Sequence, residues 1–478
     1  MLTHEVFDLL IVGGGITGAG VALDAATRGL KTALVEKGDF ASGTSSKSTK
    51  LVHGGLRYLK QLEFGLVKEV GSERAVVHRL APHLVVPEKM LLPLSEGRGL
   101  GYWLTSIGLK IYDWLAGVSK RDQRRMLTRA QTMRREPLLG RAGLKGGAIY
   151  AEYRTDDARL TIEVIKTAAR HGATILNYCD VTDFEYADGK VCGVRVRENL
   201  TQEVFTIHAR CVVSAAGPWV DELRALDKSR TGKRLHLTKG VHIVVPQEKL
   251  PVRQAIYFDV DDGRMIFAIP RGRTTYVGTT DTNYAGNKDH VVTTTADAAY
   301  LINAVNAMFP RIHLTLNDIE SSWAGLRPLI HEEGKSASEL SRKDEIFESP
   351  SGLLSIAGGK LTGYRKMAER VVDRVITQHF REFSDTASQT ATVRITQNPF
   401  RNFDEVLAYI HKVESELVPF GFTSHMAHYL VKNYGSQTRQ VIHHSSKYKT
   451  ANIKSWPCST PSCSFVLKKR WSAHWRIL

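Results

Sequence analysis

The stretch that most constrains this chain runs from Phe7 to Tyr58, close to the N-terminus. It opens with a short apolar segment, FDLLIV, that leads directly into a row of glycines, and a helix-like segment of small and apolar residues follows. A second apolar segment, KTALV, ends in Glu36. Strand, helix and strand in this order predict a βαβ unit, which belongs in a parallel sheet whose faces are covered by helices.

The glycines of this unit, Gly13, Gly15 and Gly18, have GxGxxG spacing. Such glycines allow a tight turn, close approach of the backbone to a pyrophosphate, and close packing of helix on strand. The helix N-terminus then offers N–H groups and a favourable dipole to the phosphates, and Glu36 is placed to bind ribose hydroxyls. The alternative is an ordinary glycine-rich turn, but the strands, the helix and the acid together favour a dinucleotide site.

Composition limits the class of protein. The 478 residues are enough for two or three domains, and contents of 42% hydrophobic and 24% charged residues are typical of soluble globular proteins. No apolar run approaches the roughly 20 residues of a membrane span. The N-terminus lacks the features of a signal peptide, so we expect the cytoplasmic side. The five cysteines show no metal-ligand spacing and their number is odd, which predicts reduced thiols and no metal site.

The net charge of +16 is unevenly distributed. The final 62 residues carry nine Lys/Arg and no acid, and a second block, Lys120 to Lys145, carries nine Lys/Arg against Asp122 and Glu136. Such blocks indicate affinity for anionic lipid or nucleic acid. Neither has the stacking aromatics or the groove-reading motif of a nucleic-acid binder, so we favour an anionic membrane. The aromatic segment 101–118 is open to two interpretations, a helix on a membrane surface or one packed on its own domain.

Further along the chain, two more apolar strands run into glycine turns, at Ala216-Gly217-Pro218 and at Gly358–Thr362. Three such elements predict one discontinuous nucleotide-binding domain. Residues 238–282 alternate like antiparallel strands and predict a β-sheet substrate domain, and a hairpin is expected to turn at Asp188-Gly189. Helices are predicted at 66–80, 158–172, 295–308, 402–417 and 424–433. The predicted parts are 1–85, 148–235 and 341–385 for nucleotide binding, 86–147 and 236–340 for the substrate domain, and 390–478 for a helical C-terminal region.

Polar and basic residues near these turns suggest a second site. The Gly/Ser/Thr-rich segment after Glu36 is interpreted as a loop around the cofactor, with a plain surface loop as the alternative. Arginine binds phosphate through two parallel hydrogen bonds, so a basic cluster near turns predicts an anionic substrate, and solvated surface residues are the alternative. His53 is a candidate general base, unless it is structural. The basic candidates are Arg57, Arg327, Arg342, Lys360 and Arg365.

Three motifs, at Val12–Gly29, Ser45–Leu59 and Gly358–Ala368, closely resemble those of the FAD-dependent glycerol-3-phosphate dehydrogenases. The motifs EYRTDDARL, RLHLTKG, YVGTTDT and SSWAGLRPL are similar to the bacterial branch, and the resemblance covers roughly residues 5–440. It implies an α/β fold of the D-amino-acid-oxidase type. In that fold a discontinuous Rossmann-like FAD-binding domain is joined by an antiparallel β-sheet substrate domain and an α-helical C-terminal region.

The resemblance also implies an activity. Such enzymes oxidise sn-glycerol 3-phosphate to dihydroxyacetone phosphate with FAD and pass the electrons to a membrane quinone, as peripheral proteins on the inner face of the membrane and often as homodimers. Two alternatives stay open: a glycerol-3-phosphate oxidase that uses oxygen, and a non-catalytic flavin-binding protein associated with membranes. A nicotinamide-linked enzyme is disfavoured because a single Rossmann motif followed by a long Ser/Thr-rich loop suits FAD.

Site residues are carried over by the same resemblance. The base is His53, with Arg327 and Lys360 as electrostatic partners. The substrate phosphate is bound by Arg57, Tyr58, Arg327 and Arg342. FAD is held by Gly13, Gly14, Gly15, Gly18, Glu36, Thr44, Ser45, Ser46, Lys50, Leu51, His53, Ala216, Gly217, Gly359, Lys360, Leu361 and Thr362.

The C-terminal end departs from the family pattern. The family's last domain runs several tens of residues longer and carries acidic residues, whereas this chain loses its periodicity after about residue 446. We therefore expect a truncated or frame-shifted end. Such an end affects the helical C-terminal region, dimer formation and membrane binding. The catalytic motifs lie before it and are unchanged.

Overall fold

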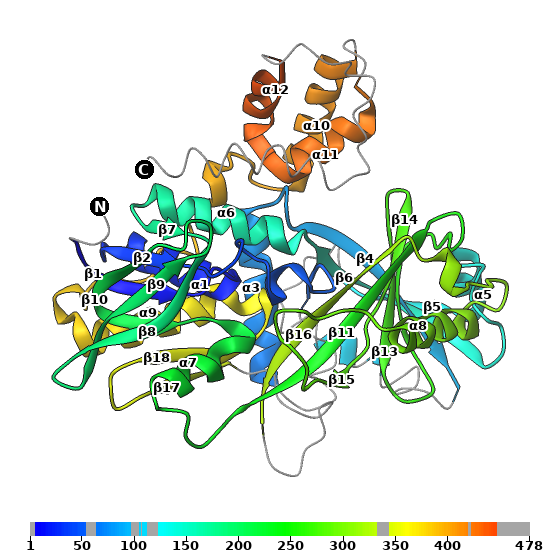
Figure 1. The fold of residues 1–478 in the computed structure, drawn as a ribbon. Helices are drawn as coiled ribbons and strands as arrows, with labels where there is room; N and C mark the ends of the chain where they lie inside the picture. The colour runs from blue at the N-terminus through cyan, green and yellow to red at the C-terminus, as the bar shows by residue number, and fades with distance from the viewer. Residues whose placement is uncertain are drawn as a thin grey trace. The chain divides into compact units, whose positions relative to one another are not determined.

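A computed structural model describes residues 5–53, 64–96, 105–106, 108–111, 123–331, 344–418 and 422–446. The chain forms two compact units (Figure 1). The first comprises residues 1–81 and 85–397, and the second comprises residues 82–84 and 398–478.

One sheet of the first unit carries the predicted βαβ element. Long crossovers connect its parallel strands, and β1 is buried on both faces because it lies inside the sheet, between β10 and β2. A hairpin strand, β17 (Asp344–Glu348), extends one edge in the antiparallel direction. The parallel strands in spatial order are β18 (Leu354–Gly358), β10 (Val204–Ser214), β1 (Val6–Val12), β2 (Thr32–Val35) and β7 (Thr174–Leu176).

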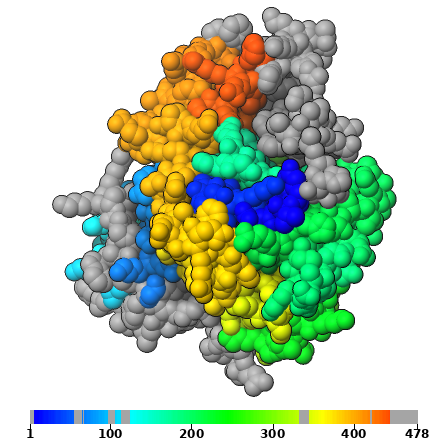
Figure 2. Space-filling model, turned by 90° about the vertical axis from the view of Figure 1, so that its left-hand side faces the viewer, coloured from blue at the N-terminus to red at the C-terminus, as the bar shows by residue number. Residues whose placement is uncertain are grey.

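Helices pack beside this sheet. Helix α1 (Ile16–Thr27) contacts both α6 (Asp157–Arg170) and α9 (Tyr364–His379). Figure 2 shows the N-terminal segment in blue between the yellow segment that contains α9 and the green segments that follow α6. The close contact of α1 with α9 is possible because Gly20 has no side chain. A Cβ there would lie 3.0 Å from the Tyr364 ring.

The second sheet of the unit, on the right in Figure 1, is antiparallel apart from the pairing of β4 with β12. Helix α8 (Thr295–Met308) packs on it over a core that includes Ile243, Ile256 and Phe258. The strands predicted within 238–282 are thereby confirmed. The strands are β3 (Leu51–Val52), β4 (Val86–Ser95), β5 (Arg125–Thr128), β6 (Leu144–Arg154), β11 (Leu235–Pro246), β12 (Ala255–Asp259), β13 (Met265–Arg271), β14 (Thr274–Gly278), β15 (Thr282–Asn283) and β16 (Ser321–Ile330).

The predicted hairpin is confirmed between β8 (Cys179–Ala187) and β9 (Lys190–Glu198). Asp188 and Gly189 have φ of 50° and 73°, the left-handed pair that a two-residue turn with the twist of the strands requires. The predicted helices are also present. They are α3 (Phe64–Leu80), α6, α8, α10 (Phe403–Leu417) and α11 (Ser424–Tyr434).

The second unit is helical where it is described. Helix α10 begins at the cap Asn402, whose side chain accepts a hydrogen bond from the Glu405 N–H, and Thr423 caps α11 in the same way. Helix α12 (Thr438–Ser446) follows. The apolar faces meet in a small core, as the 3.6-residue period predicts. That core contains Val406, Ile410, Val413, Leu417, Ala427 and Val431.

Several predictions fall partly or wholly outside the described residues. These include the aromatic residues Tyr102, Trp103, Tyr112 and Trp114, and the sequence after 446.

Within the described ranges, no helix has both the length and the hydropathy to cross a membrane. Of the three described cysteines, Cys179 and Cys211 are buried free thiols, and Cys192 is only half-buried. Burial raises the pKa of Cys211 to about 12.

Candidate functional site

The three glycine turns meet at one edge of the parallel sheet. Val12 at the end of β1 is in register with Ser214 of β10, and Ser214 is in register with Ser355 of β18. Because the strands are parallel, the turns that follow them emerge at the same edge. The strand order also reverses at β1, with β2 on one side and β10 on the other, which creates the crevice in which α/β proteins bind nucleotides. The three turns therefore lie at one edge of the sheet, and their joint role in binding a nucleotide stays a prediction.

The first turn has no room for side chains. Gly13 has a φ of +116°, and a Cβ there would lie 2.6 Å from the Ala215 carbonyl oxygen. A Cβ on Gly18 would lie 1.9 Å from the Gly13 carbonyl oxygen. Glycine at these positions therefore lets α1 begin close to the strand ends and leaves backbone exposed to a diphosphate.

The side chains of Glu36 and Ser45 accept hydrogen bonds from backbone N–H groups of the first turn and of the start of α1. The Gly14 N–H donates to Glu36 Oε2 over 2.6 Å, and the Gly38 N–H donates to Glu36 Oε1 over 2.8 Å. Ser45 Oγ accepts from the Ile16 N–H at the start of α1 over 2.9 Å. Burial raises the pKa of Glu36, against the effect of the two N–H donors. The acid at the end of β2 is thus positioned by the turn itself.

The Ser/Thr-rich segment links this turn to the second sheet. Thr44, in a short 3-10 turn, donates from Oγ1 to the Leu326 carbonyl over 2.8 Å. At the other end of the segment, the His53 carbonyl accepts from Thr362 Oγ1 over 3.1 Å. The segment therefore brings together β16, which carries Arg327, and the turn after β18.

Other predicted cofactor ligands have structural partners as well. Lys50, with a φ of 58°, forms an ion pair with Asp157 over 2.7 Å and donates to the Ser46 carbonyl. Leu51 is buried in the core of the second sheet. Their roles toward a cofactor stay predictions.

The turns after β10 and β18 complete this edge. Gly217 has a φ of 54°, and Gly359 has a φ of 79°. The φ of Gly359 favours glycine, because side chains rarely adopt it, and a Cβ there would also lie 2.4 Å from the Met367 sulfur. Lys360 follows and precedes the short 3-10 turn Leu361–Gly363. Ala216 precedes the corresponding turn after β10.

Arg327 is fixed across the face of β11. Its Nη1 donates to the Thr280 carbonyl and to Asp281 Oδ1, both over 3.1 Å, and its Nη2 donates to Thr279 Oγ1 over 2.8 Å. The guanidinium lies over Gly240, where a Cβ would be 2.3 Å from Nη2. A cation held in one place, with a glycine below it, is suited to bind an anion or to stabilise a developing negative charge.

His242 was missed by the sequence analysis. It is 1% exposed, its ring stacks on Trp323 at 4.7 Å between centroids, and its Nε2 lies 3.0 Å from Thr49 Oγ1. Burial, with the charges of Arg327 and Lys50, holds the pKa of His242 well below its usual range. One signal in the sequence could have found it, namely the strand alternation that places it on the face of Gly240. Its register partner Gly278, whose missing side chain makes room for the ring, is known only from the sheet.

We expect His242→Phe to make the folded protein less sensitive to acid. Unfolding lets the wild-type imidazole take up a proton below its ordinary pKa of 6.5. The unfolded state then binds more protons, so stability falls as the pH drops below that value, by up to about 1.4 kcal/mol per pH unit. Phenylalanine keeps a ring against Trp323 and removes this proton. Melting temperatures near pH 7 and pH 5 measure the effect, with the exposed His208→Gln as control. An equal acid-induced drop in wild type and His242→Phe would refute it.

The prediction for Arg365 as part of the anion-binding cluster is wrong. Its Nε donates to Glu73 over 2.8 Å, its Nη2 pairs with the same carboxylate, and its Nη1 pairs with Glu369. Both members of the Arg365–Glu73 pair are buried. These ion pairs occupy the guanidinium because Arg365 of α9 lies against Glu73 of α3. The sequence alone does not show this contact.

Replacing Glu73 by glutamine is expected to lower the free energy of unfolding, by up to about 3–5 kcal/mol, because it removes the buried carboxylate that binds Nε and Nη2 of Arg365 and leaves the guanidinium with Glu369 as its carboxylate partner. The apparent KM for the substrate should not change. Urea unfolding measures the first quantity. Glu382→Gln, which removes an exposed ion pair with Arg210 at 3.6 Å, is the control and should cost less than about 1 kcal/mol. Similar losses in both variants would contradict a structural role for the buried pair.

Three predicted substrate ligands, Arg57, Tyr58 and Arg342, lie outside the described residues. Among the described ones, Arg327, His53 and Lys360 belong to segments that contact one another through Thr44 and Thr362. The remaining residues fit a dinucleotide. They offer a turn in which backbone blocks the Cβ positions of Gly13 and Gly18, a half-buried acid at the end of β2, and a buried Trp219 indole N–H with no hydrogen-bond partner among the described residues.

Comparison with known proteins agrees with this geometry. The family model DAO, FAD dependent oxidoreductase, matches residues 8–365. The chain is 52% identical over 444 residues to the aerobic glycerol-3-phosphate dehydrogenase of Bacillus subtilis, covering 92% of this chain and 80% of the relative.

Solved structures give the same result. The glycerol-3-phosphate dehydrogenase of Bacillus halodurans, complexed with FAD, superposes with a TM-score of 0.78 at 46% identity and covers 94% of this chain and 79% of that one. The L-alpha-glycerophosphate oxidase of Mycoplasma pneumoniae has a TM-score of 0.61 at 20% identity over 78% of this chain and 95% of that one, and shares the fold. This chain therefore belongs to the DAO family of FAD-dependent oxidoreductases, alongside the aerobic glycerol-3-phosphate dehydrogenases, and its cofactor is FAD.

Proposed function

We propose that the protein oxidises sn-glycerol 3-phosphate to dihydroxyacetone phosphate and passes the electrons to a membrane quinone. The observation that carries the proposal is the 52% identity to aerobic glycerol-3-phosphate dehydrogenase over 444 residues. The fixed Arg327 beside the segment that begins at the dinucleotide turn supports it, because the substrate is an anion whose C2 oxygen becomes more negative as the reaction proceeds.

The residues divide the work as follows. FAD, when bound, supplies the acceptor for the hydride that leaves C2. His53 takes the proton of the C2 hydroxyl, while Arg327 and Lys360 stabilise the oxygen that loses it. Arg57, Tyr58, Arg342 and Arg327 bind the phosphate, which fixes the substrate in one orientation.

The choice of His53 over His242 as base rests on electrostatics. A base must accept a proton near neutral pH, and burial beside Arg327 and Lys50 opposes protonation of His242. The His53 side chain, by contrast, is partly exposed, and its carbonyl is tied to Thr362 in the turn beside Lys360. We assign His242 the role of a neutral ring that fills the space under Gly278 and supports Thr49.

We further propose peripheral binding to the inner, cytoplasmic face of an anionic membrane, with a homodimer as the assembly. A hollow of about 260 Å³ at β5 and α5 (Arg129–Arg135) supports the membrane contact, because Arg125, Arg134 and Arg135 line it. Cationic side chains near an anionic surface each contribute roughly 1 kcal/mol of attraction.

Anaerobic addition of glycerol 3-phosphate to the purified flavoprotein tests the reaction. Loss of the oxidised flavin absorbance, with dihydroxyacetone phosphate as product, is the expected result. An unchanged spectrum would favour the non-catalytic alternative. Turnover with a soluble quinone analogue against turnover with oxygen then tests the acceptor, since rapid peroxide formation with no gain from quinone would indicate an oxidase.

A further inference from the structure

The middle of the Ser/Thr-rich segment (residues 44–53) is held by a buried carboxylate. Asp157, the first residue of α6, is fully buried. Its Oδ2 accepts a hydrogen bond from the Ser48 N–H over 3.0 Å and another from Ser48 Oγ over 2.6 Å, and its Oδ1 accepts from Lys50 Nζ over 2.7 Å. One carboxylate thus binds two residues of the segment, and these three residues form the Asp157 clamp.

The backbone of Lys50 depends on such a clamp. Its φ of 58° lies in the left-handed region, which residues with side chains rarely adopt and which persists only where the surroundings hold it. Ser48 Oγ accepts from the Lys50 N–H over 2.9 Å. The ammonium group donates to Asp157 and to the Ser46 carbonyl, and it lies 5.3 Å from the centre of the Trp323 ring. The side chain of Lys50 therefore stabilises the segment to which it belongs.

All three carbonyl groups of residues 48–50 accept hydrogen bonds from elsewhere in the first unit. The donors, in chain order of the acceptors, are Trp323 Nε1 over 3.2 Å, the Tyr276 hydroxyl over 3.1 Å and the Thr155 N–H over 2.9 Å. Trp323 and Tyr276 belong to the second sheet, whereas Thr155 precedes α6. The stretch 48–50 is thus fixed in one shape by groups from both parts of the unit.

We propose that Asp157 is a positioning residue for FAD, and that it acts by holding residues 48–50 in shape before the cofactor binds. The segment begins where Ser45 Oγ accepts from the first N–H of α1, and it ends where the His53 carbonyl contacts the turn after β18. Because the stretch between these ends is already ordered, FAD binding does not have to offset the conformational entropy of ordering it.

Lys50 then belongs to the clamp and is not a direct ligand of FAD through its ammonium group. The inference concerns the cofactor of the family and does not depend on glycerol 3-phosphate as the substrate. Its tests therefore measure FAD binding and need no turnover.

Replacing Asp157 by asparagine breaks the clamp at nearly constant volume. Both carboxylate oxygens face donors, since Oδ1 accepts from the Ala158 N–H as well as from Lys50, so the amide NH2 must meet at least one donor. We expect the Kd for FAD to rise about tenfold or more. Equilibrium dilution of the holoenzyme, with the fluorescence of released flavin as the signal, measures this Kd. A Kd equal to that of the wild type would overturn the positioning role.

Lys50→Met and the double variant Lys50→Met/Asp157→Asn show whether the lysine acts through Asp157. Because both substitutions break the same clamp, the Kd of the double variant should lie within about threefold of that of the weaker-binding single variant. Losses that multiply in the double variant would mean that Lys50 binds the cofactor by itself, and would overturn the clamp.

Asp297→Asn is the matched control, because Asp297 makes the same kinds of contact at the start of α8. It is buried, accepts from the N–H and the hydroxyl of Thr294, and pairs with Lys239 over 2.6 Å. None of these contacts involves the Ser/Thr-rich segment. Both variants should unfold at lower urea concentration, whereas only Asp157→Asn should lose FAD affinity and change the visible circular dichroism of the bound flavin. Equal Kd increases in the two variants would show that Asp157 only stabilises the fold.

Ser48→Ala covers the case in which Asp157→Asn does not fold. It removes only the hydroxyl that lies between Asp157 Oδ2 and the Lys50 N–H, on a side chain that is half-buried. Its Kd for FAD should rise about threefold or more, since one hydrogen bond to a charged group is lost. An unchanged Kd in this variant would also overturn the proposal.

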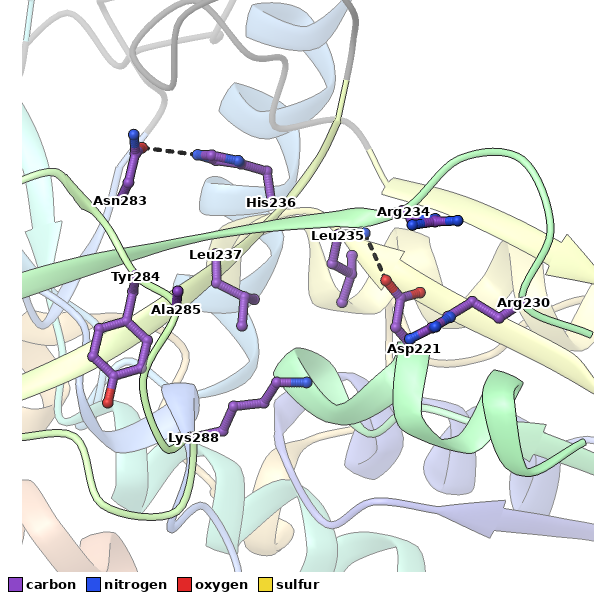
Figure 3. Close-up of a pocket in the computed structure, with 10 residues that line it drawn as sticks. All are labelled: Asp221, Arg230, Arg234, Leu235, His236, Leu237, Asn283, Tyr284, Ala285 and Lys288. Carbon is purple, nitrogen blue, oxygen red and sulfur yellow. Dashed lines mark hydrogen bonds between the residues drawn. The ribbon is translucent and has the colours of Figure 1, made fainter. Parts of the chain in front are cut away.

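Arg230→Met controls for the loss of one positive charge in Lys50→Met. Arg230 is exposed and lines a hollow of about 470 Å³ beside the start of β11 (Figure 3). The lining of that hollow includes no residue of the Ser/Thr-rich segment. The Kd of Arg230→Met for FAD should stay within about twofold of wild type, because exposed charges contribute little. A loss as large as that of Lys50→Met would show an effect of net charge and would overturn the role of the clamp.

Discussion

Replacing Gly18 by alanine is expected to yield a protein without bound FAD. The added Cβ would lie 1.9 Å from the Gly13 carbonyl oxygen, and the backbone that carries both atoms is held in place by β1 and α1. Overpacking costs about 1–3 kcal/mol even where side chains can adjust, and here the obstacle is backbone. If the upper end of that range is lost from FAD binding, the Kd for FAD rises about 100-fold.

Flavin content per polypeptide and the apparent Kd for added FAD measure this effect. Gly65→Ala is the matched control, because Gly65 is an exposed helical glycine with open space around it. Gly15→Ala gives a milder comparison, since its Cβ would meet only Ser45 Oγ at 3.1 Å. We expect the order of cofactor loss to be Gly18, then Gly15, then Gly65. Full flavin content in Gly18→Ala would show that the turn is not packed as described.

Arg327→Ala is expected to raise the apparent KM for glycerol 3-phosphate about tenfold or more while the protein stays yellow. A hydrogen bond to a charged group contributes about 1.5–3 kcal/mol, and each 1.4 kcal/mol corresponds to a factor of ten. If Arg327 also stabilises the developing alkoxide, kcat falls as well. Arg273→Ala, which removes an exposed arginine paired with Glu320, is the control and should leave both constants near wild type.

Gly240→Ala tests the same site without removing the charge. A Cβ at this position would lie 2.3 Å from Arg327 Nη2, so the guanidinium must leave its place over β11. The variant should therefore show the kinetic defect of Arg327→Ala, with flavin content and circular dichroism unchanged. Normal kinetics in Gly240→Ala together with a defect in Arg327→Ala would mean that catalysis needs the charge of Arg327 but not its position over Gly240.

Much of the architecture was predictable because local rules and the fold agree. The βαβ unit, the hairpin turn at Asp188-Gly189 and the boundaries of α8 follow from periodicity, turn chemistry and capping, all of which act over a few residues. The adjacency of three glycine turns was also predictable, since parallel strands must end at one edge of a sheet.

The identity of the basic residues that act together was less predictable. Arg327 and Arg365 both adjoin turns or glycines in the sequence, and only the packing of α9 on α3 distinguishes them, because it gives Arg365 the buried partner Glu73. His242 carried no motif. It became visible when β14 brought Gly278 opposite it and β16 brought Trp323 against its ring.

The sequence by itself determined the dinucleotide turn and its acid, because the steric exclusion at Gly18, whose Cβ would meet Gly13, and the spacing to Glu36 are properties of one short segment. The tertiary structure decided how that segment meets the rest of the chain. Thr44 binds the strand that carries Arg327, and His53 binds the turn after β18, although these partners are more than 270 positions away. Such contacts depend on sheet pairing between distant strands, and no local pattern encodes which distant strand arrives beside a given loop.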